Sequence, residues 1–166
     1  HGSSVIILPK KNGYELTVVG LPKTVDNDVS PVSQTLGAWT AAEQGSIFFE
    51  NIVNENTTST RQLIIHEVMG RHCGWLTAKT ARDYRDRLKN RNFIPELMVE
   101  KSKWDIDAIY IPEQDFDFQY EAERLRNLMD KKDNVNIFLS EGAGQEAIIR
   151  EMEEKGDNVP RDAFGH

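Results

Sequence analysis

Residues 62–90, QLIIHEVMGRHCGWLTAKTARDYRDRLKN, hold a short apolar run followed directly by a long, charged segment. The run Gln62–Val68 has the length and the Ile and Val content of a buried strand, whereas His72–Asn90 has the length of a helix. Glycines lie between the two, as is typical of a turn from strand to helix. The stretch therefore predicts one unit made of a β-strand and the α-helix that follows it.

The same alternation continues along the rest of the chain. Further strands are predicted at Tyr14–Pro22, Asp107–Glu113 and Asn134–Gly142, and further helices at Pro31–Asn56, around Tyr120–Lys131 and at Gln145–Gly156. Four such units in series predict an α/β fold of three layers, αβα, with a mainly parallel sheet. Because the strands are apolar on both sides, we expect helices on both faces of the sheet. Segment 91–107 is expected to be an irregular connector, since Pro95 would interrupt a helix there.

The bulk properties are those of a globular protein. The chain has 166 residues, a formal net charge of −7 and one cysteine, Cys73. We expect residues 1–13 to be an N-terminal segment, whose opening HGSS is compatible with a cloning remnant, and residues 14–166 to be a single α/β region. The negative charge argues against a nucleic-acid surface, which needs clustered Lys and Arg. No apolar run approaches the roughly 18 residues of a membrane span, and a single cysteine cannot form an internal disulfide, so a cytoplasmic location is expected.

In parallel sheets of this kind, ligands bind beyond the C-terminal ends of the strands. Three predicted loops lie there and combine charged with small residues: 22–28 (PKTVDND), 69–74 (MGRHCG) and 140–144 (SEGAG). A fourth loop, PEQDFD at 112–117, is polar but less distinctive. We therefore expect the first three loops to form the functional site.

The first loop places two carboxylates one residue apart. In an extended stretch the side chains of Asp26 and Asp28 would point the same way and repel each other, so the pair favours a cation, either a metal ion or Lys23. One carboxylate would then act as a general base while the other binds Mg²⁺. Thr24 would donate a hydrogen bond to a phosphate oxygen. The alternative is an ordinary turn, because Asp and Asn favour turns and helix caps.

The other two loops offer groups for an anion and for a sugar. Gly70 would let backbone N–H groups approach an anion at a helix N-terminus, and the Arg71 guanidinium suits phosphate. The alternative for this loop is a plain turn with Arg71 in solvent. Glu141 would accept hydrogen bonds from sugar hydroxyls or cap the following helix. Met69 would pack or contact substrate, and Cys73 is expected to be a small buried residue and not a nucleophile.

Together these loops resemble the phosphofructokinase family, and more closely its pyrophosphate-dependent branch. GLPKTVDNDV (20–29) is similar to the family's catalytic loop, Gly-x-Pro-x-Thr-x-Asp-Asn-Asp. HEVMGRHCGW (66–75) is similar to its Met-Gly-Arg segment, and NIFLSEGAG (136–144) to its third substrate loop. The order and spacing of all three motifs fit, and the resemblance extends from about Tyr14 to His166.

The resemblance implies a phosphofructokinase-like fold and phosphoryl transfer to the 1-hydroxyl of fructose 6-phosphate, which gives fructose 1,6-bisphosphate in glycolysis. It implies that Asp26 is the general base for that hydroxyl, with Thr24 beside it and Asp28 near Mg²⁺. ATP-using relatives generally carry glycine at the position of Lys23. The lysine therefore implies pyrophosphate as the donor, because its side chain would fill the space of a nucleotide's α-phosphate and attract pyrophosphate.

The resemblance also implies contacts from the other two loops and a larger protein. Met69, Gly70 and Arg71 would contact the sugar phosphate or the transferring group, and Glu141 would hold the sugar. Family members are homo-oligomers and are longer than this chain, and their Gly-Gly-Asp loop is not found before Tyr14. We therefore expect a central fragment with little or no turnover of its own. The alternatives are an ATP-dependent phosphofructokinase and a non-catalytic binding or structural subunit.

Overall fold

The computed structural model describes residues 19–56, 58–97 and 99–160. Its strands are β1 (Lys23–Thr24), β2 (Leu36–Gly37), β3 (Gln62–Val68), β4 (Ala108–Tyr110) and β5 (Asn134–Ser140). Its helices are α1 (Ala38–Asn56), α2 (Trp75–Lys89), the 3₁₀ helix η2 (Pro95–Leu97), α3 (Lys101–Trp104), α4 (Phe118–Lys132) and α5 (Gln145–Lys155). From β2 to α5, each strand is followed by a helix, as the sequence predicts, and η2 and α3 lie between α2 and β4.

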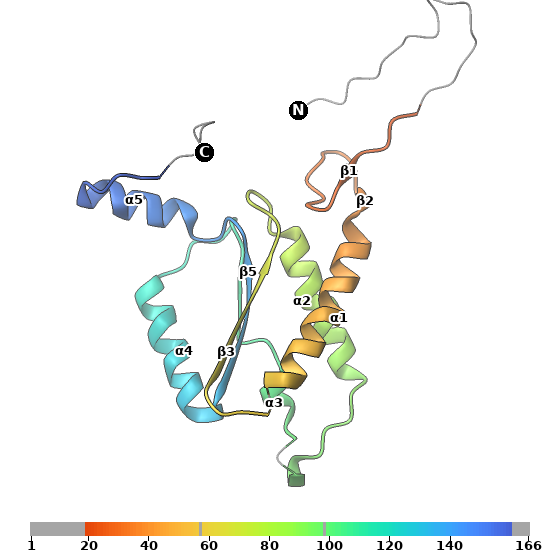
Figure 1. Cartoon of the computed structure of the whole chain (residues 1–166). Helices are drawn as coiled ribbons and strands as arrows, with labels where there is room; N and C mark the ends of the chain where they lie inside the picture. Colours follow the sequence, from red (N-terminus) through yellow and green to blue (C-terminus); the bar gives the residue numbers. More distant parts are fainter. Residues whose placement is uncertain (1–18, 57, 98, 161–166) are drawn as a thin grey trace, which may run out of the picture.

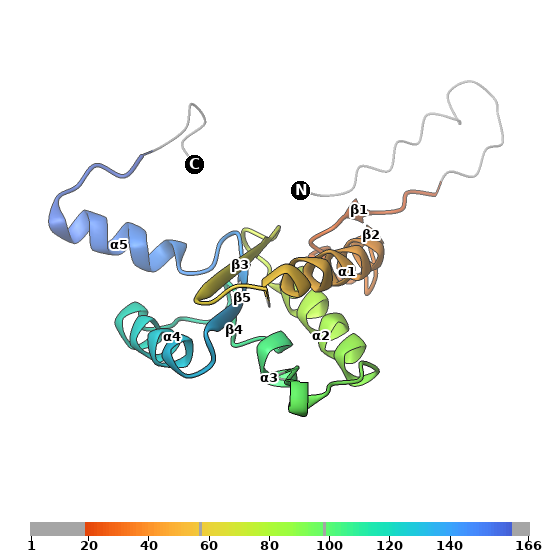
Figure 2. The ribbon, with the colours of Figure 1, turned by 60° about the horizontal axis from the view of Figure 1, so that its bottom comes forward.

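The central sheet has the strand order β3-β5-β4, and its pairings are parallel. β3 and β5 pair along their whole length, from Gln62 opposite Asn134 to Val68 opposite Ser140. Helices α1 and α2 lie against one face of the sheet and α4 against the other, whereas α5 extends away from the sheet (Figure 1, Figure 2). The predicted three-layer αβα fold with a parallel sheet is confirmed.

Each face of the sheet has its own apolar core. On the side of α1 and α2, the buried ring of Phe49 lies 4.7 Å from that of Tyr84 and 4.4 Å from that of Phe138, between centroids. On the side of α4, Val135 and Ile137 of β5 pack with apolar residues of that helix. Because large buried rings contribute much of a core's free energy, these two cores hold the sheet and the C-terminal ends of its strands in place.

His66 of β3 lies in the first core. Its ring centroid is 5.2 Å from that of Phe49 and 5.0 Å from that of Phe138. Burial lowers the pKa of the His66 imidazole below its ordinary value of 6.5. The folded state therefore keeps this histidine neutral at pH values at which the unfolded chain already binds a proton.

We expect the free energy of unfolding to fall as the pH drops below about 6.5, because the unfolded chain then gains a proton that folded His66 does not. For one histidine the slope is at most about 1.4 kcal/mol per pH unit. Urea unfolding at about pH 7.5 and about pH 5.5 measures it, and His66→Leu should remove this part of the pH dependence. The control is His72→Gln at an exposed position, which should keep it. An unchanged slope in His66→Leu would contradict the assignment.

The first predicted strand, Tyr14–Pro22, is absent from those of its residues that the structure describes. Residues 14–18 lie outside the described residues, and residues 19–22 are not in a strand, with Val19 and Leu21 exposed. β1 pairs with β2, and neither strand joins the central sheet. A strand needs a neighbour to satisfy its backbone groups and cover its side chains. The described part of the chain offers no such neighbour to residues 19–21.

Two further boundaries differ from prediction. The helix predicted at Pro31–Asn56 begins at Ala38, because Gly37 has a φ of +94°, which a helix does not allow, and β2 pairs with β1. The connector 91–107 is more regular than predicted, since it contains η2 and α3. Pro95 is the first residue of η2, a position where a missing N–H costs little.

One face of β3 is open, against the expectation of helices on both faces. Leu63 and Ile65 are 54% and 53% exposed. The reason is that α4 packs against β5 and β4, while α5 extends away from β3 (Figure 1). Within the described residues, the sheet is therefore covered on both faces only around β5 and β4. None of the described helices is both long and apolar enough to span a membrane.

Candidate active site

The loops after β3 and β5 are joined by hydrogen bonds. The Ser140 hydroxyl donates to the Gly70 carbonyl oxygen at 2.7 Å, and the Glu141 N–H donates to the Val68 carbonyl oxygen at 2.9 Å. Ser140 is fully buried, so water does not compete for its contact. The parallel pairing of β3 with β5 thus brings two of the three predicted loops together, as the strand-end rule predicts.

Two glycines allow these loops to approach so closely. A Cβ on Gly70, whose φ is +134°, would lie 2.3 Å from the Cys73 carbonyl oxygen of the same loop and 3.1 Å from the Ser140 hydroxyl oxygen of the other loop. A Cβ on Gly142 would lie 1.8 Å from the Arg71 carbonyl oxygen. No side chain fits at these distances, so the close contact of the loops requires glycine at both positions.

Arg71 and Glu141 form an ion pair between the two loops. Nε and one terminal nitrogen of Arg71 lie 3.3 and 3.1 Å from the same Glu141 carboxylate oxygen. The two side chains are 49% and 37% exposed, so the pair contributes little to folding and can open towards a ligand. The N-cap of α5 is Gly144, and no side chain caps that helix, so the capping alternative for Glu141 is wrong. Met69 is also exposed, so it does not pack in a core.

A carboxylate from a fourth loop occupies the N-terminus of α2. Both carboxylate oxygens of Glu113 accept the Gly74 N–H, at N···O distances of 2.8 and 3.0 Å. α2 has no acidic residue in its first turn, so Glu113 supplies the negative charge that favours a helix N-terminus. Loop 69–74 is predicted to bind an external anion, but the N–H of Gly74 is already occupied by the protein's own carboxylate. The position of loop 112–117 beyond a strand end is the signal that could have identified Glu113.

We expect Glu113→Ala to lower the free energy of unfolding by about 1 kcal/mol, the usual cost of losing a helix N-cap interaction. Glu113→Gln should cost less, because the amide oxygen can still accept the Gly74 N–H. Urea unfolding at neutral pH measures both. Glu96→Ala, at an exposed position in η2, is the matched control. Equal losses in the Glu113 and Glu96 variants would show that the contact with α2 adds nothing.

The loop after β1 has the backbone of a turn. Asn27 has a φ of +55°, so the stretch is not extended and the predicted strand-like alternation of Asp26 and Asp28 is wrong. The Asp26 N–H donates to the Thr24 hydroxyl oxygen at 3.1 Å. A hydroxyl that accepts a hydrogen bond can still donate its own hydrogen, so Thr24 keeps its capacity to bind a phosphate oxygen. Lys23 begins β1 and its side chain is exposed.

Asp26 has an unusual electrostatic environment. Its Oδ1 atom is buried without a hydrogen-bond partner. Burial raises the pKa of the Asp26 carboxyl above its ordinary value of 3.8. The negative charges of Asp28 and Glu141 raise this pKa further, by smaller amounts. A carboxylate whose pKa is shifted towards neutral pH, with an oxygen open to accept a proton, is suited to general-base chemistry.

Cys73 lies among the acidic residues of several loops. Burial raises the pKa of its thiol, and a backbone hydrogen bond at Trp75 opposes that rise. The charges of Glu113, Asp28 and Asp26 raise the pKa further. A thiol that stays protonated is a poor nucleophile, so Cys73 is a packing residue at the junction of the loops, although it is only partly buried.

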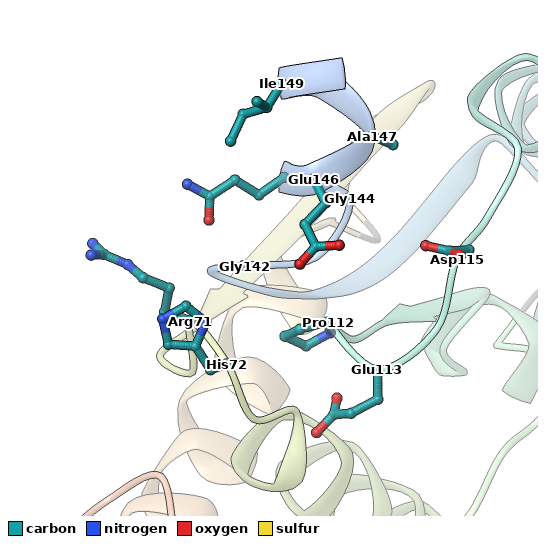
Figure 3. A pocket seen from close by; sticks show the side chains of 11 residues that line it. Arg71, His72, Pro112, Glu113, Asp115, Gly142, Gly144, Glu146, Ala147 and Ile149 are labelled. Atoms are coloured by element: carbon teal, nitrogen blue, oxygen red, sulfur yellow. The ribbon is translucent and has the colours of Figure 1, made fainter. Parts of the chain in front are cut away.

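A cavity of about 370 Å³ opens beside Arg71 (Figure 3). Arg71 and His72 lie on one side of it, and residues 112–115 and the start of α5 form the other sides. Loop 22–28 does not line the cavity. The cavity therefore gives small ligands access to the Arg71 guanidinium, but it is not the place where a group near Asp26 would react.

Mg²⁺ fits the acidic loop only together with other ligands. The parts of the chain that the structure describes contain no group of three or more His, Cys, Asp or Glu side chains that could hold a metal ion. The negative charge of Asp28 nevertheless raises the pKa of Asp26, and Asp26 has an unpartnered buried oxygen. Mg²⁺ in phosphoryl-transfer sites is commonly bound by one or two carboxylates together with phosphates and water, and the loop can supply that number.

The fold and the site together define a class of protein. An arginine beyond the strand ends of a parallel αβα sheet, together with a base-like carboxylate on a separate loop, is typical of α/β enzymes that act on phosphorylated ligands. The chain belongs to the phosphofructokinase family, because a model of the family described as "Phosphofructokinase" matches residues 3–166. The family resemblance of the three motifs is thereby confirmed.

Individual relatives agree with the pyrophosphate-dependent branch. The "Pyrophosphate--fructose 6-phosphate 1-phosphotransferase" of Methylomonas methanica is 59% identical over 156 residues, which cover 94% of this chain and 38% of that protein. The "ATP-dependent 6-phosphofructokinase subunit alpha" of Saccharomyces cerevisiae is 37% identical over 102 residues, which cover 59% of this chain and 9% of that protein. The chain thus spans 38% of the length of its Methylomonas relative.

A solved structure agrees with the fold. The crystal structure of pyrophosphate-dependent phosphofructokinase from Nitrosospira multiformis matches with a TM-score of 0.54 and 25% sequence identity. The match covers 90% of this chain and 36% of that chain. The phosphofructokinase-like fold expected from the motifs is therefore confirmed.

Proposed function

We propose that this chain is part of an enzyme that transfers a phosphoryl group from pyrophosphate to the 1-hydroxyl of fructose 6-phosphate, giving fructose 1,6-bisphosphate and phosphate. The observation that carries the proposal is the Asp26 carboxylate, with its buried, unpartnered Oδ1 and its raised pKa. The relatives named as pyrophosphate-dependent support the choice of donor, because they are 51–59% identical to this chain, whereas the ATP-dependent relatives are 26–38% identical.

In this proposal Asp26 acts as the general base. It takes the proton of the 1-hydroxyl while the hydroxyl oxygen forms a bond to one phosphorus of pyrophosphate, and the P–O bond to the bridging oxygen breaks to release phosphate. Phosphoryl transfer depends mainly on positioning and on neutralising charge. Thr24 donates a hydrogen bond to a phosphate oxygen, and the exposed Arg71 guanidinium neutralises phosphate charge.

The remaining residues bind substrates. Lys23, exposed at the start of β1, attracts pyrophosphate and fills the space that a nucleotide would need. Glu141 accepts hydrogen bonds from the sugar hydroxyls when its pair with Arg71 opens. Met69 and Gly70 contact the sugar phosphate.

We further propose the setting in which the enzyme works. Asp28 would hold Mg²⁺ together with substrate phosphates, and the ion, when bound, would offset part of their negative charge. We expect a homo-oligomeric protein in the cytoplasm, with neither nucleic acid nor a membrane as a partner.

An aldolase-coupled assay tests the proposal. The full-length gene product and the 166-residue chain are each given fructose 6-phosphate with pyrophosphate or with ATP. We expect turnover with pyrophosphate by the full-length protein, much less with ATP, and little or none by the chain alone. A preference for ATP would contradict the assigned donor, and no phosphorylation with either donor would contradict the activity. Robust turnover by the 166-residue chain would contradict the expectation of an inactive fragment.

A further inference from the structure

Two residues hold the loop around Asp26 through their hydrogen bonds. The Asn27 side-chain oxygen accepts the Thr35 N–H at 2.8 Å, and the Asn27 side-chain nitrogen donates to the Ser33 carbonyl oxygen at 3.2 Å. The Thr35 hydroxyl lies 2.6 Å from the Thr24 carbonyl oxygen and 3.1 Å from the Asn27 side-chain oxygen. Thr35 is only 1% exposed, so these contacts are shielded from water. We refer to this set of contacts between Asn27 and Thr35 as the Asn27–Thr35 clamp.

The distances within the clamp show which of two possible acceptors receives the hydrogen bond of the Thr35 hydroxyl. A threonine hydroxyl has one hydrogen to donate, and the shorter distance favours the Thr24 carbonyl oxygen as its acceptor. The Asn27 oxygen is then held by the Thr35 N–H. Thr35 therefore binds the chain on both sides of Asp26, at Thr24 before it and at Asn27 after it.

The clamp also connects the loop to the helices. Thr35 directly precedes β2, which leads into α1. Near the start of α1, the Trp39 ring lies 4.7 Å from the ring of Trp75, at the start of α2, between centroids. Trp75 follows loop 69–74, so the position of Thr35 is tied to the scaffold that carries Arg71. A short two-residue strand pair such as β1–β2 is a weak anchor by itself.

We propose that Thr35, together with Asn27, is a positioning residue that holds the Asp26 carboxylate in place against the loops after β3 and β5. The proposal rests on the function proposed above, in which Asp26 is the general base. Thr35 does not touch the reacting atoms, and it acts through the backbone of Thr24 and the side chain of Asn27. The Gly-x-Pro-x-Thr-x-Asp-Asn-Asp motif does not include Thr35.

The test uses two substitutions at Thr35 in the full-length gene product. Thr35→Val keeps the shape of the side chain and removes the hydroxyl, whereas Thr35→Ser keeps the hydroxyl. The matched control is Thr80→Val, because Thr80 is also buried, lies on α2, and has no hydrogen-bond partner for its hydroxyl. Each variant is assayed with pyrophosphate, and hydrogen exchange of the amides of residues 22–37 is measured in parallel.

We expect Thr35→Val to lower kcat by about tenfold, because a small displacement of a catalytic group is costly, while KM for fructose 6-phosphate changes by less than about twofold. Amides of residues 22–37 should exchange faster. Thr35→Ser and Thr80→Val should resemble the unchanged protein in all three measurements.

Several outcomes would overturn the inference. One is a Thr35→Val enzyme with unchanged kcat. Another is a Thr35→Ser enzyme as impaired as Thr35→Val, which would mean that the hydroxyl is irrelevant. If the unchanged protein has no activity with pyrophosphate, the proposed function fails. The hydrogen-exchange comparison then still decides whether the hydroxyl of Thr35 holds the loop, and equal exchange in all variants would refute the clamp.

Discussion

Replacing Asp26 with Asn in the full-length protein is expected to lower kcat for pyrophosphate-dependent phosphorylation of fructose 6-phosphate by about 10²–10⁴, the usual contribution of a general base. Asn has nearly the same shape but cannot take up the hydroxyl proton. KM for the sugar phosphate should change little, because the contacts of Arg71 and Glu141 are left intact. Steady-state kinetics with both substrates varied measures the effect.

The substitution should not act by unfolding the protein. The raised pKa of Asp26 means that the folded state binds a proton at this site more tightly than the unfolded state does. The protonated Asp26 carboxyl therefore contributes its full stabilisation below pH 3.8, and this stabilisation is lost as the pH rises through the pKa of the folded state. At neutral pH the ionised Asp26 lowers the free energy of unfolding. Asp26→Asn should thus unfold no more easily than the unchanged protein at pH 7.

A control and a decisive negative result accompany this prediction. Asp130 is an exposed carboxylate that pairs with Arg61 on the surface. Asp130→Asn should leave kcat unchanged, because an exposed pair of this kind contributes little. If Asp26→Asn keeps full turnover, another group takes the proton and the assignment of the base is wrong.

Replacing Lys23 is expected to lower kcat/KM for pyrophosphate by roughly 10–10²-fold, which corresponds to the roughly 1.5–3 kcal/mol of a hydrogen bond to a charged group. Two variants separate attraction from obstruction. Lys23→Met removes the charge but keeps much of the bulk, whereas Lys23→Gly removes both. Both should weaken the use of pyrophosphate, and only Lys23→Gly should gain some activity with ATP. Kinetics with each donor at saturating fructose 6-phosphate distinguish them.

The outcome for Lys23 bears on the donor alone. Unchanged pyrophosphate kinetics in both variants would reject the role of its charge. Equal ATP activity in Lys23→Met and Lys23→Gly would reject the idea that bulk excludes the nucleotide. Neither result would affect the assignment of Asp26, because Lys23 lies on β1 and Asp26 in the turn that follows it.

Several elements could be predicted from the sequence because their signals are local. The strand Gln62–Val68 has the predicted bounds, and the helix predicted up to Gly156 ends at Lys155, with Gly156 in the left-handed conformation that terminates helices. The loops at 69–74 and 140–144 could also be located, since they follow β3 and β5 directly, whereas loop 22–28 was located by its motif alone. By contrast, the segment 19–22 has a strand-like sequence but is not a strand in the structure, because a strand also needs a neighbour.

The linear chain was enough to predict the unit β3–α2, the strands and helices around β4 and β5, the parallel αβα class, the family and the loops that carry Asp26, Arg71 and Glu141. Composition, periodicity and motif spacing can all be taken from the order of the residues. The contacts of Glu113 with α2, of Thr35 with the loop around Asp26 and of Arg71 with Glu141 could be seen only in the folded molecule. Side-chain partners depend on how the chain folds, and the partners of Glu113 and Arg71 lie 39 and 70 residues away in the sequence.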